Sequence, residues 1–248
     1  METIRFENRD CLELLKELPT GSVDLMLQDP PYGVTQNEWD KEPFLPLMWA
    51  EWERVLKPDG AWIFFSTNPF AASLITSRAG FFRYDIVWKK SHPTGFLNAK
   101  RMPLRSHELI LVFYRSLPTY NPILKKKPKK DIRPDTGNSK HSSNYGSYSL
   151  APSRDVAEDL SYPKSIWECS IDQNQVHPTQ KPLKLIRELV HTYSNEGDTV
   201  FDGYSGSGTT AIACIKEKRK FIGAELNAEY YSIAADRIKE ESSKLVLF

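Results

Sequence analysis

Hydrophobic residues along the chain fall into short runs separated by turn residues and helix-capping residues. Six apolar runs indicate strands, most of them buried on both faces of a sheet: 22–29, 60–66, 84–90, 108–115, 198–202 and 220–226. Between them lie stretches that predict helices: 11–18, 44–57, 182–194, 208–218 and 228–244. Because strands and helices alternate, the pattern predicts an α/β fold with a mainly parallel sheet.

One segment lacks this alternation. Residues 116–164 are rich in Lys, Pro, Asn, Ser, Gly and Tyr and show no clear period. Loops of this length are uncommon inside a compact domain unless they have a function or are disordered. We therefore expect an insert between two halves of one sheet, with boundaries at 1–115, 116–164 and 165–248.

Of the 248 residues, 40% are hydrophobic and 26% are charged. This composition is typical of a globular protein with a substantial core. No apolar run approaches the length that spans a bilayer, and the first ten residues carry charges of both signs, so neither a membrane partner nor export is expected. Three scattered cysteines without a CxxC pair argue against a metal site and a disulfide framework. These features predict a cytoplasmic location.

Charge is distributed unevenly along the chain. Residues 83–133 hold thirteen Lys or Arg and three acids, a net charge of +10, whereas the whole chain carries a formal net charge of only +1. Aromatic residues and prolines are interleaved with this basic block. Such a block is either a solvated surface or a site for a polyanion, and we favour the polyanion.

The glycine-rich stretch VFDGYSGSGTT, 200–210, predicts a strand, a turn and the start of a helix. A phosphate P-loop would need lysine where Thr209 stands. A dinucleotide site fits G-x-G-x-x-A at 206–211, with Glu225 as the ribose acid. Asp202 favours S-adenosylmethionine instead, because an acid aimed at a diphosphate would repel it. A purely structural turn is the remaining interpretation.

The stretch QDPPYG, 28–33, ends a buried strand in an acid, two prolines and an aromatic ring. An exocyclic amino nitrogen is a poor nucleophile, because its lone pair is delocalised into the ring. The Asp29 carboxylate and the Pro30 carbonyl could hold its two hydrogens, and the prolines would keep both acceptors rigid. Tyr32 could stack on a base removed from its duplex. The alternative is an ordinary Asp-Pro turn.

These two sites make the chain resemble the DNA amino-methyltransferases of the permuted β class, in which the catalytic motif precedes the cofactor motif. QDPPYG matches the catalytic D/N/S-P-P-Y/F, FDGYSGSGTT resembles D-P-F-x-G-x-G-T-T, and HPTQKP at 177–182 matches H-P-x-x-K-P. The resemblance covers most of the chain. It implies a Rossmann-like methyltransferase fold, with a doubly wound sheet, circularly permuted motif order and an inserted target-recognition region.

The resemblance also implies the cofactor S-adenosylmethionine and a set of site residues. The catalytic residues would be Asp29, Pro30, Pro31 and Tyr32. The residues around the cofactor would be Asp10, Cys11, Thr179, Lys181, Asp202, Tyr204, Gly206, Gly208, Thr209 and Glu225. In the family pattern, Asp10 and the Cys11 backbone bind adenine, and Lys181 lies near the methionine carboxylate. No metal is implied.

Double-stranded DNA is the implied partner. The residues expected to contact it are Lys89, Lys100, Arg101, Arg105, Lys125, Lys126 and Lys127. Residues 91–106 would form a mobile loop near the target base. A homodimer and a cognate restriction endonuclease are further partners that the resemblance allows.

The sequence departs from the family pattern at Arg9, where a glycine is usual, and at Gly203-Tyr204, which replaces Pro-Phe. Our hypothesis is adenine N6 methylation of a specific duplex DNA sequence with base flipping, since aspartate first and tyrosine fourth in the catalytic motif favour adenine. The alternatives are cytosine N4 methylation, methylation of RNA or of a protein amide, and a catalytically idle DNA-binding module.

Overall fold

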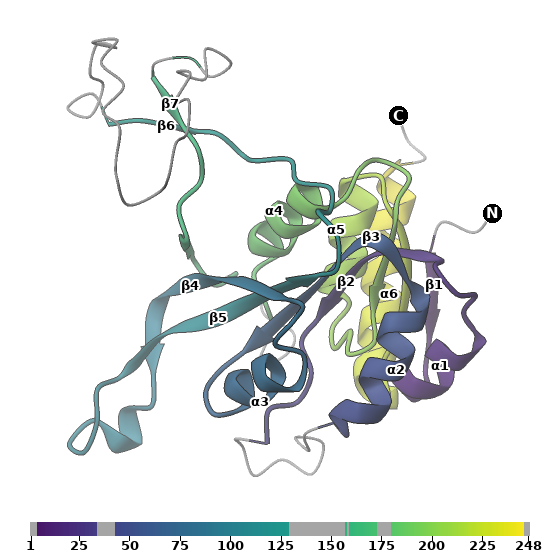
Figure 1. Ribbon diagram of the computed structural model, residues 1–248, viewed down its shortest axis with the longest axis horizontal. Coiled ribbons are helices and arrows are strands. Elements are labelled where there is room, and N and C mark those ends of the chain that lie inside the picture. Colours follow the sequence, from purple (N-terminus) through teal and green to yellow (C-terminus); the bar gives the residue numbers. More distant parts are fainter. Residues whose placement is uncertain (1–3, 34–42, 129–156, 158, 173–179, 246–248) are drawn as a thin grey trace. The chain divides into compact units, whose positions relative to one another are not determined.

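The computed structural model describes residues 4–33, 43–128, 157, 159–172 and 180–245 (Figure 1). No helix in these ranges is both long and apolar enough to cross a membrane.

The chain divides into two compact units. The larger one comprises Met1–Asn121 and Ser165–Phe248, and the smaller one comprises Pro122–Lys164. Within the smaller unit, β6 (Lys125–Lys126) pairs antiparallel with β7 (Leu160–Ser161).

The larger unit is built on an eight-stranded sheet in the order β1-β10-β9-β2-β3-β5-β4-β8. Its strands are β1 (Ile4–Glu7), β2 (Val23–Gln28), β3 (Leu56–Ser66), β4 (Phe82–Thr94), β5 (Arg105–Tyr114), β8 (Ile166–Cys169), β9 (Thr199–Asp202) and β10 (Lys220–Ala224). Neighbouring strands run parallel except at β5, which is antiparallel to both β3 and β4. The prediction of a mainly parallel sheet is therefore confirmed.

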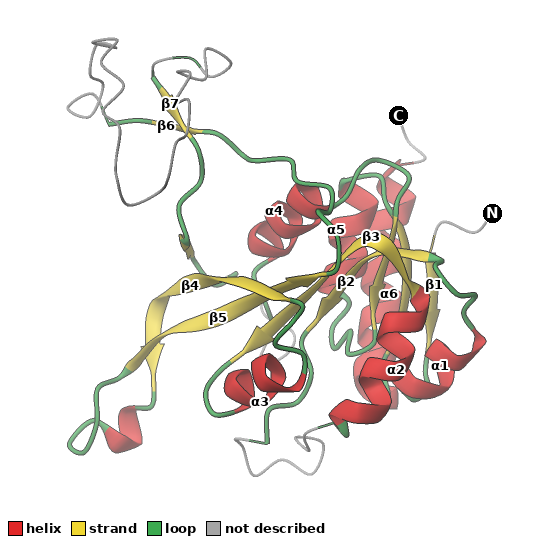
Figure 2. Ribbon diagram, in the orientation of Figure 1, coloured by secondary structure: helices red, strands yellow, loops and turns green. Residues whose placement is uncertain are grey.

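Helices cover both faces of this sheet (Figure 2). They are α1 (Cys11–Glu17), α2 (Leu45–Val55), α3 (Phe70–Ser77), α4 (Leu183–Tyr193), α5 (Thr209–Lys216) and α6 (Ala228–Leu245). One apolar cluster joins α1, α2 and α3 to the sheet around the fully buried Trp49, Trp52 and Trp62. A second joins α4, α5 and α6 to the sheet through residues such as Leu189 and Ile238. The fold is thus doubly wound.

Two strands that are far apart in sequence lie side by side at the centre of the sheet. β2 pairs parallel with β9, with Leu25 opposite Val200 and Met26 opposite Phe201. Parallel neighbours end at the same edge of a sheet, where ligands bind in open α/β folds. The residues after β2 and the glycine loop after β9 therefore meet at one edge.

The predicted strand 84–90 is part of a longer, more exposed strand. β4 pairs along its length with β5 and forms a two-stranded ribbon that extends from the body of the sheet (Figure 1). Only Ile86 and Trp88 of β4 are buried. The expected loop 91–106 is largely the end of this ribbon: β4 continues to Thr94, and the 3₁₀ helix η1 (Phe96–Asn98) precedes β5.

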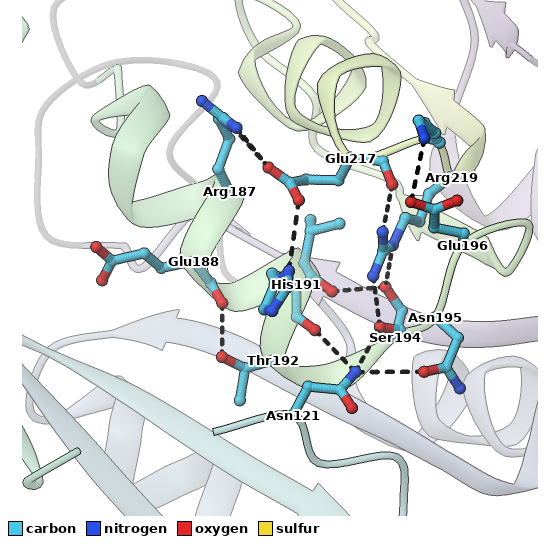
Figure 3. A network of polar contacts seen from close by, with 12 residues as sticks. Asn121, Arg187, Glu188, His191, Thr192, Ser194, Asn195, Glu196, Glu217 and Arg219 are labelled. Carbon is cyan, nitrogen blue, oxygen red and sulfur yellow. Dashed lines mark hydrogen bonds and ion pairs between the residues drawn. The ribbon is translucent and has the colours of Figure 1, made fainter. Parts of the chain in front are cut away.

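A polar network fixes the end of α4 beside the start of β9 (Figure 3). The buried Arg219 donates to the Ser194 hydroxyl at 3.0 Å and to the Ser194 carbonyl at 2.6 Å. The Asn121 side chain donates to the carbonyls of His191, at 3.1 Å, and Ser194, at 3.0 Å. These bonds satisfy carbonyls that the helix end leaves without intrahelical partners.

Candidate active site

The buried Gln28, the last residue of β2, joins the two halves of the site. Its side-chain nitrogen donates to the Phe201 carbonyl at 2.8 Å, and its side-chain oxygen accepts from the Gly203 N–H at 3.2 Å. Sequence reasoning missed Gln28, although a polar amide at the end of an apolar strand could have indicated a buried hydrogen bond to a neighbouring segment. Gln28 fixes where the chain leaves β2 relative to the glycine loop.

Asp29 directly follows this residue, and both of its carboxylate oxygens have partners. The Tyr32 hydroxyl donates to Oδ1 at 2.5 Å, and the Lys181 ammonium donates to Oδ2 at 2.5 Å. Tyr32 also stacks on Phe70, with ring centroids 5.7 Å apart. The predicted catalytic stretch Asp29-Pro30-Pro31-Tyr32 therefore presents an oriented carboxylate to the cavity described below.

Lys181 links Asp29 to a second acid that sequence reasoning did not single out. Its ammonium lies 3.6 Å from Glu108 Oε2, and Glu108 Oε1 forms an ion pair with Lys90. Burial acts to lower the pKa of Lys181, but the attraction of Asp29 and Glu108 raises it above its ordinary value. Burial likewise opposes ionisation of Glu108, yet the two lysines lower its pKa. Glu108 and Lys181 are therefore charged together.

Asp202 ends β9 and is only 4% exposed. Its Oδ1 accepts from the Tyr204 N–H at 3.0 Å. Burial raises the pKa of Asp202 to about 7, against the hydrogen bonds from Thr210 and Tyr204, which lower it. Among the described residues no cationic side chain forms an ion pair with it. A buried acid of this kind is suited to a ligand that brings a positive charge.

The glycine turn is held by a second acid. Glu225 accepts from the Gly206 N–H at 2.8 Å and, through its other oxygen, from the Asn227 N–H at 2.8 Å. Burial raises the pKa of Glu225, although these backbone N–H groups lower it. Gly208 has φ 78° at the start of α5, a conformation that favours glycine. The buried Thr209 hydroxyl has no hydrogen-bond partner among the described residues.

The other predicted cofactor residues lie at the start of α1 and after β9. Asp10 caps α1, since its side chain accepts from the Leu12 and Glu13 N–H groups at 2.9 and 3.2 Å. The Cys11 thiol is buried, which raises its pKa well above the ordinary value. Both residues line the same cavity as Tyr204. Thr179 lies outside the described residues.

The structure explains why glycine occupies position 203. A Cβ on Gly203 would lie 2.0 Å from the Cys11 sulfur, and a proline there could not donate to Gln28. We expect Gly203→Ala to lower the free energy of unfolding by about 1–3 kcal/mol through overpacking. Urea unfolding measures this effect.

Gly80→Ala is the matched control for that substitution, because a Cβ on Gly80 meets nothing within 4 Å. Adding Cys11→Ala to Gly203→Ala removes the clashing sulfur and should restore part of the lost stability. Equal stabilities of the Gly203→Ala and Gly80→Ala proteins would contradict the close approach.

One cavity of ≈ 1030 Å³ joins these groups. Its lining includes Asp29 and Tyr32 from the catalytic stretch and Asp202, Gly206 and Glu225 from the predicted cofactor site. The structure therefore brings together residues that the sequence places about 170 positions apart. In the described residues, no group of three or more His, Cys, Asp or Glu could hold a metal ion.

The predicted DNA contacts occupy three places. Lys89 forms an exposed ion pair with Glu168 at 2.9 Å. Lys100, Arg101 and Arg105 lie on the ribbon, and Arg105 also lines the cavity. The residues at 125–127 belong to the smaller unit, where the Lys127 N–H donates to the Asp159 carbonyl at 2.7 Å.

Comparisons with known proteins agree on one family. The N6/N4 methyltransferase family model, described as DNA methylase, matches residues 23–236. DNA adenine methyltransferase YhdJ of Escherichia coli (strain K12) is 30% identical, over 92% of this chain and 80% of that protein. Type II methyltransferase M1.MboII of Moraxella bovis is also 30% identical, over 94% of this chain and 96% of that protein.

Solved structures share the fold. The M1.HpyAVI–SAM complex superposes with a TM-score of 0.63 at 24% identity, covering 94% of this chain and 99% of that one. The PvuII DNA methyltransferase, described as cytosine-N4-specific, superposes with a TM-score of 0.65 at 17% identity, covering 98% of this chain and 94% of that one.

Proposed function

Because the chain belongs to the N6-adenine/N4-cytosine DNA methylase family, we propose that it transfers a methyl group from S-adenosylmethionine to the N6 amino group of adenine in duplex DNA. The observation that carries this proposal is the single cavity lined by both Asp29 and Asp202. A hydrogen-bond acceptor for an amino group and a buried acid suited to a cationic ligand thus face the same cavity.

The residues around Asp202 fit the proposed cofactor. S-adenosylmethionine supplies an electrophilic methyl group on a sulfonium sulfur and carries an ammonium, a ribose and an adenine. Asp202 would pair with the ammonium, and Glu225, already oriented by two backbone N–H groups, would accept from the ribose hydroxyls. The Thr209 hydroxyl offers a polar group without a partner among the described residues. Asp10 and the Cys11 backbone would bind the adenine.

On the catalytic side, the Asp29 carboxylate and the Pro30 carbonyl would accept the two hydrogens of the target amino group. Holding both hydrogens draws the nitrogen towards tetrahedral geometry and frees its lone pair for attack on the methyl carbon. As the new N–C bond forms, the C–S bond breaks, and the cationic nitrogen then releases a proton. Tyr32 orients Asp29 through its hydroxyl and offers its ring to the base.

Lys181 and Glu108 are positioning residues in this scheme. The Lys181 ammonium donates to Asp29 and forms a second ion pair with Glu108. We expect Lys181→Met to lower kcat by about tenfold to a hundredfold, because the carboxylate loses its orientation. The cofactor Kd should change little, since no reacting group of the cofactor depends on Lys181 in this arrangement. Steady-state kinetics and calorimetry separate the two quantities.

Lys184→Met is the matched control, since Lys184 lies on α4 with a side chain that is 74% exposed. The family resemblance places Lys181 near the methionine carboxylate instead. A raised cofactor Kd with an unchanged kcat in Lys181→Met would support that placement and contradict the role at Asp29.

The base assignment is part of the proposal. The aspartate and tyrosine of the catalytic stretch support adenine, as does the relative named an adenine methyltransferase. We assign target recognition to residues 116–164, a range that includes the compact unit Pro122–Lys164. Lys125, Lys126 and Lys127 there would contact phosphates, which dominate nucleic-acid affinity.

Two measurements test the proposed function. The purified chain is incubated with tritiated S-adenosylmethionine and with DNA, RNA or protein, and we expect label in DNA alone. Base-resolution sequencing of DNA from expressing cells then identifies the modified base and its sequence context. Label in RNA or protein alone would overturn the DNA substrate, and N4-methylcytosine would overturn the adenine assignment.

A further inference from the structure

The end of the β4–β5 ribbon presents an apolar surface to solvent. Phe96 is 67% exposed, Leu97 102% and Met102 59%. Phe96 and Leu97 lie in η1, which follows Gly95 in a left-handed conformation with φ 91°. The ribbon carries this tip away from the body of the sheet (Figures 1 and 2). Grouped large apolar side chains left in water mark an interaction surface.

The charges around this tip select its partner. Between His92 and His107, the end of the ribbon carries Lys100, Arg101 and Arg105 and no acid. Lys100 and Arg101, directly after η1, form no ion pair with the described residues. Basic residues beside the apolar tip disfavour a purely apolar protein partner and favour a polyanion. Apolar and basic side chains together match a duplex whose stacked bases lie between phosphate strands.

The tip is also within reach of the cavity. Thr94 and Arg105, where the two strands of the ribbon pair, both line the cavity that contains Asp29. Leu97 is three residues beyond Thr94, so its Cα lies at most about 11 Å from that lining residue. Side chains at this distance from the cavity lining can contact the base pair whose target base enters the cavity.

We propose that Phe96 and Leu97 form a wedge that enters the DNA duplex beside the target base and fills the space the base leaves. Lys100 and Arg101 hold the adjacent phosphates. Extracting a base costs unstacking and unpairing energy, and apolar contacts from the inserted side chains offset part of that cost. The inference rests on the proposed function and adds the residues that open the duplex.

The test compares two duplexes that carry the sequence context found by the sequencing above. In one the target base is paired, and in the other it faces an abasic position, so that little unpairing is needed. We expect the double variant Phe96→Ala/Leu97→Ala to lose about tenfold or more in single-turnover rate on the paired duplex. On the abasic duplex its rate should stay within about threefold of wild type. With 2-aminopurine at the target position, the variant should show less fluorescence increase.

Ile166→Ala is the matched control, because Ile166 is 57% exposed and lies on β8, outside both the ribbon and residues 116–164. It should behave as wild type on both duplexes. Equal losses of the double variant on both duplexes, or no loss on either, would overturn the wedge while leaving the proposed function in place. A wild-type dimer that the double variant converts to monomer would assign the tip to a second copy instead. No transfer by wild type to either duplex overturns the proposed function and the wedge with it.

Discussion

Replacing Asp29 by alanine is expected to lower methyl transfer by at least about a hundredfold, because the target amino group loses one of its two rigid acceptors. The Kd for S-adenosylmethionine should stay within about threefold of wild type, since the proposed cofactor contacts of Asp202 and Glu225, in another part of the cavity, are unchanged. Single-turnover transfer of tritiated methyl to DNA measures the first quantity, and calorimetry with S-adenosylmethionine measures the second.

Asp29→Asn refines this prediction. It keeps an acceptor oxygen but removes the charge that pairs with Lys181, so its activity should lie between that of wild type and Asp29→Ala. Asp236→Ala, at an exposed position on α6, is the control for loss of an acid elsewhere. If Asp29→Ala transfers methyl at the wild-type rate, the catalytic role is wrong.

Asp202→Asn is expected to raise the Kd for S-adenosylmethionine by about a hundredfold or more, because the ammonium of the ligand would lose the buried counter-charge that Asp202 supplies. Binding requires the ionised carboxylate, and the pKa of Asp202 is about 7 in the ligand-free protein. The wild-type affinity should therefore increase as the pH rises from about 6 to about 7.5. In Asp202→Asn this increase should be absent, which calorimetry at both pH values can measure.

Asp202 also makes the stability of the ligand-free fold depend on pH, and this stability falls where the ligand affinity rises. The pKa of Asp202 is raised from 3.8 to about 7, so the folded protein binds a proton that the unfolded chain has released. Its contribution to ligand-free stability is present at low pH and is lost as the pH rises through about 7. Asp202→Asn should not show this loss in thermal unfolding. An affinity that is independent of pH in wild type and equal in the variant would contradict the role of Asp202.

Much of the fold follows from local sequence. The runs at 22–29 and 198–202 are apolar along nearly their whole length, and only a strand covered on both faces can bury such a run. Both are central strands of the sheet. The run at 84–90 was less informative, because β4 buries only two of its side chains and extends into a ribbon. Its pairing with β5 depends on the partner strand rather than on its own pattern.

Motif spacing made the candidate residues recognisable, since the glycine turn, the acids and the prolines stand at fixed offsets within short segments. It could not assign their contacts. Gln28 was not singled out, yet it ties the ends of β2 and β9 together. The resemblance places Lys181 near the cofactor, and only the structure shows that its ammonium contacts Asp29, 152 residues away in the sequence.

The sequence by itself thus determined the alternation of strands and helices, the two chemical motifs and their permuted order, because these properties depend on residues that are close along the chain. Only the tertiary structure decided that the motifs share one cavity, that Lys181 lies between Asp29 and Glu108, and that an apolar tip extends from a basic ribbon. Those features depend on which distant segments pack together, and burial, ion pairing and exposure exist only once the segments meet.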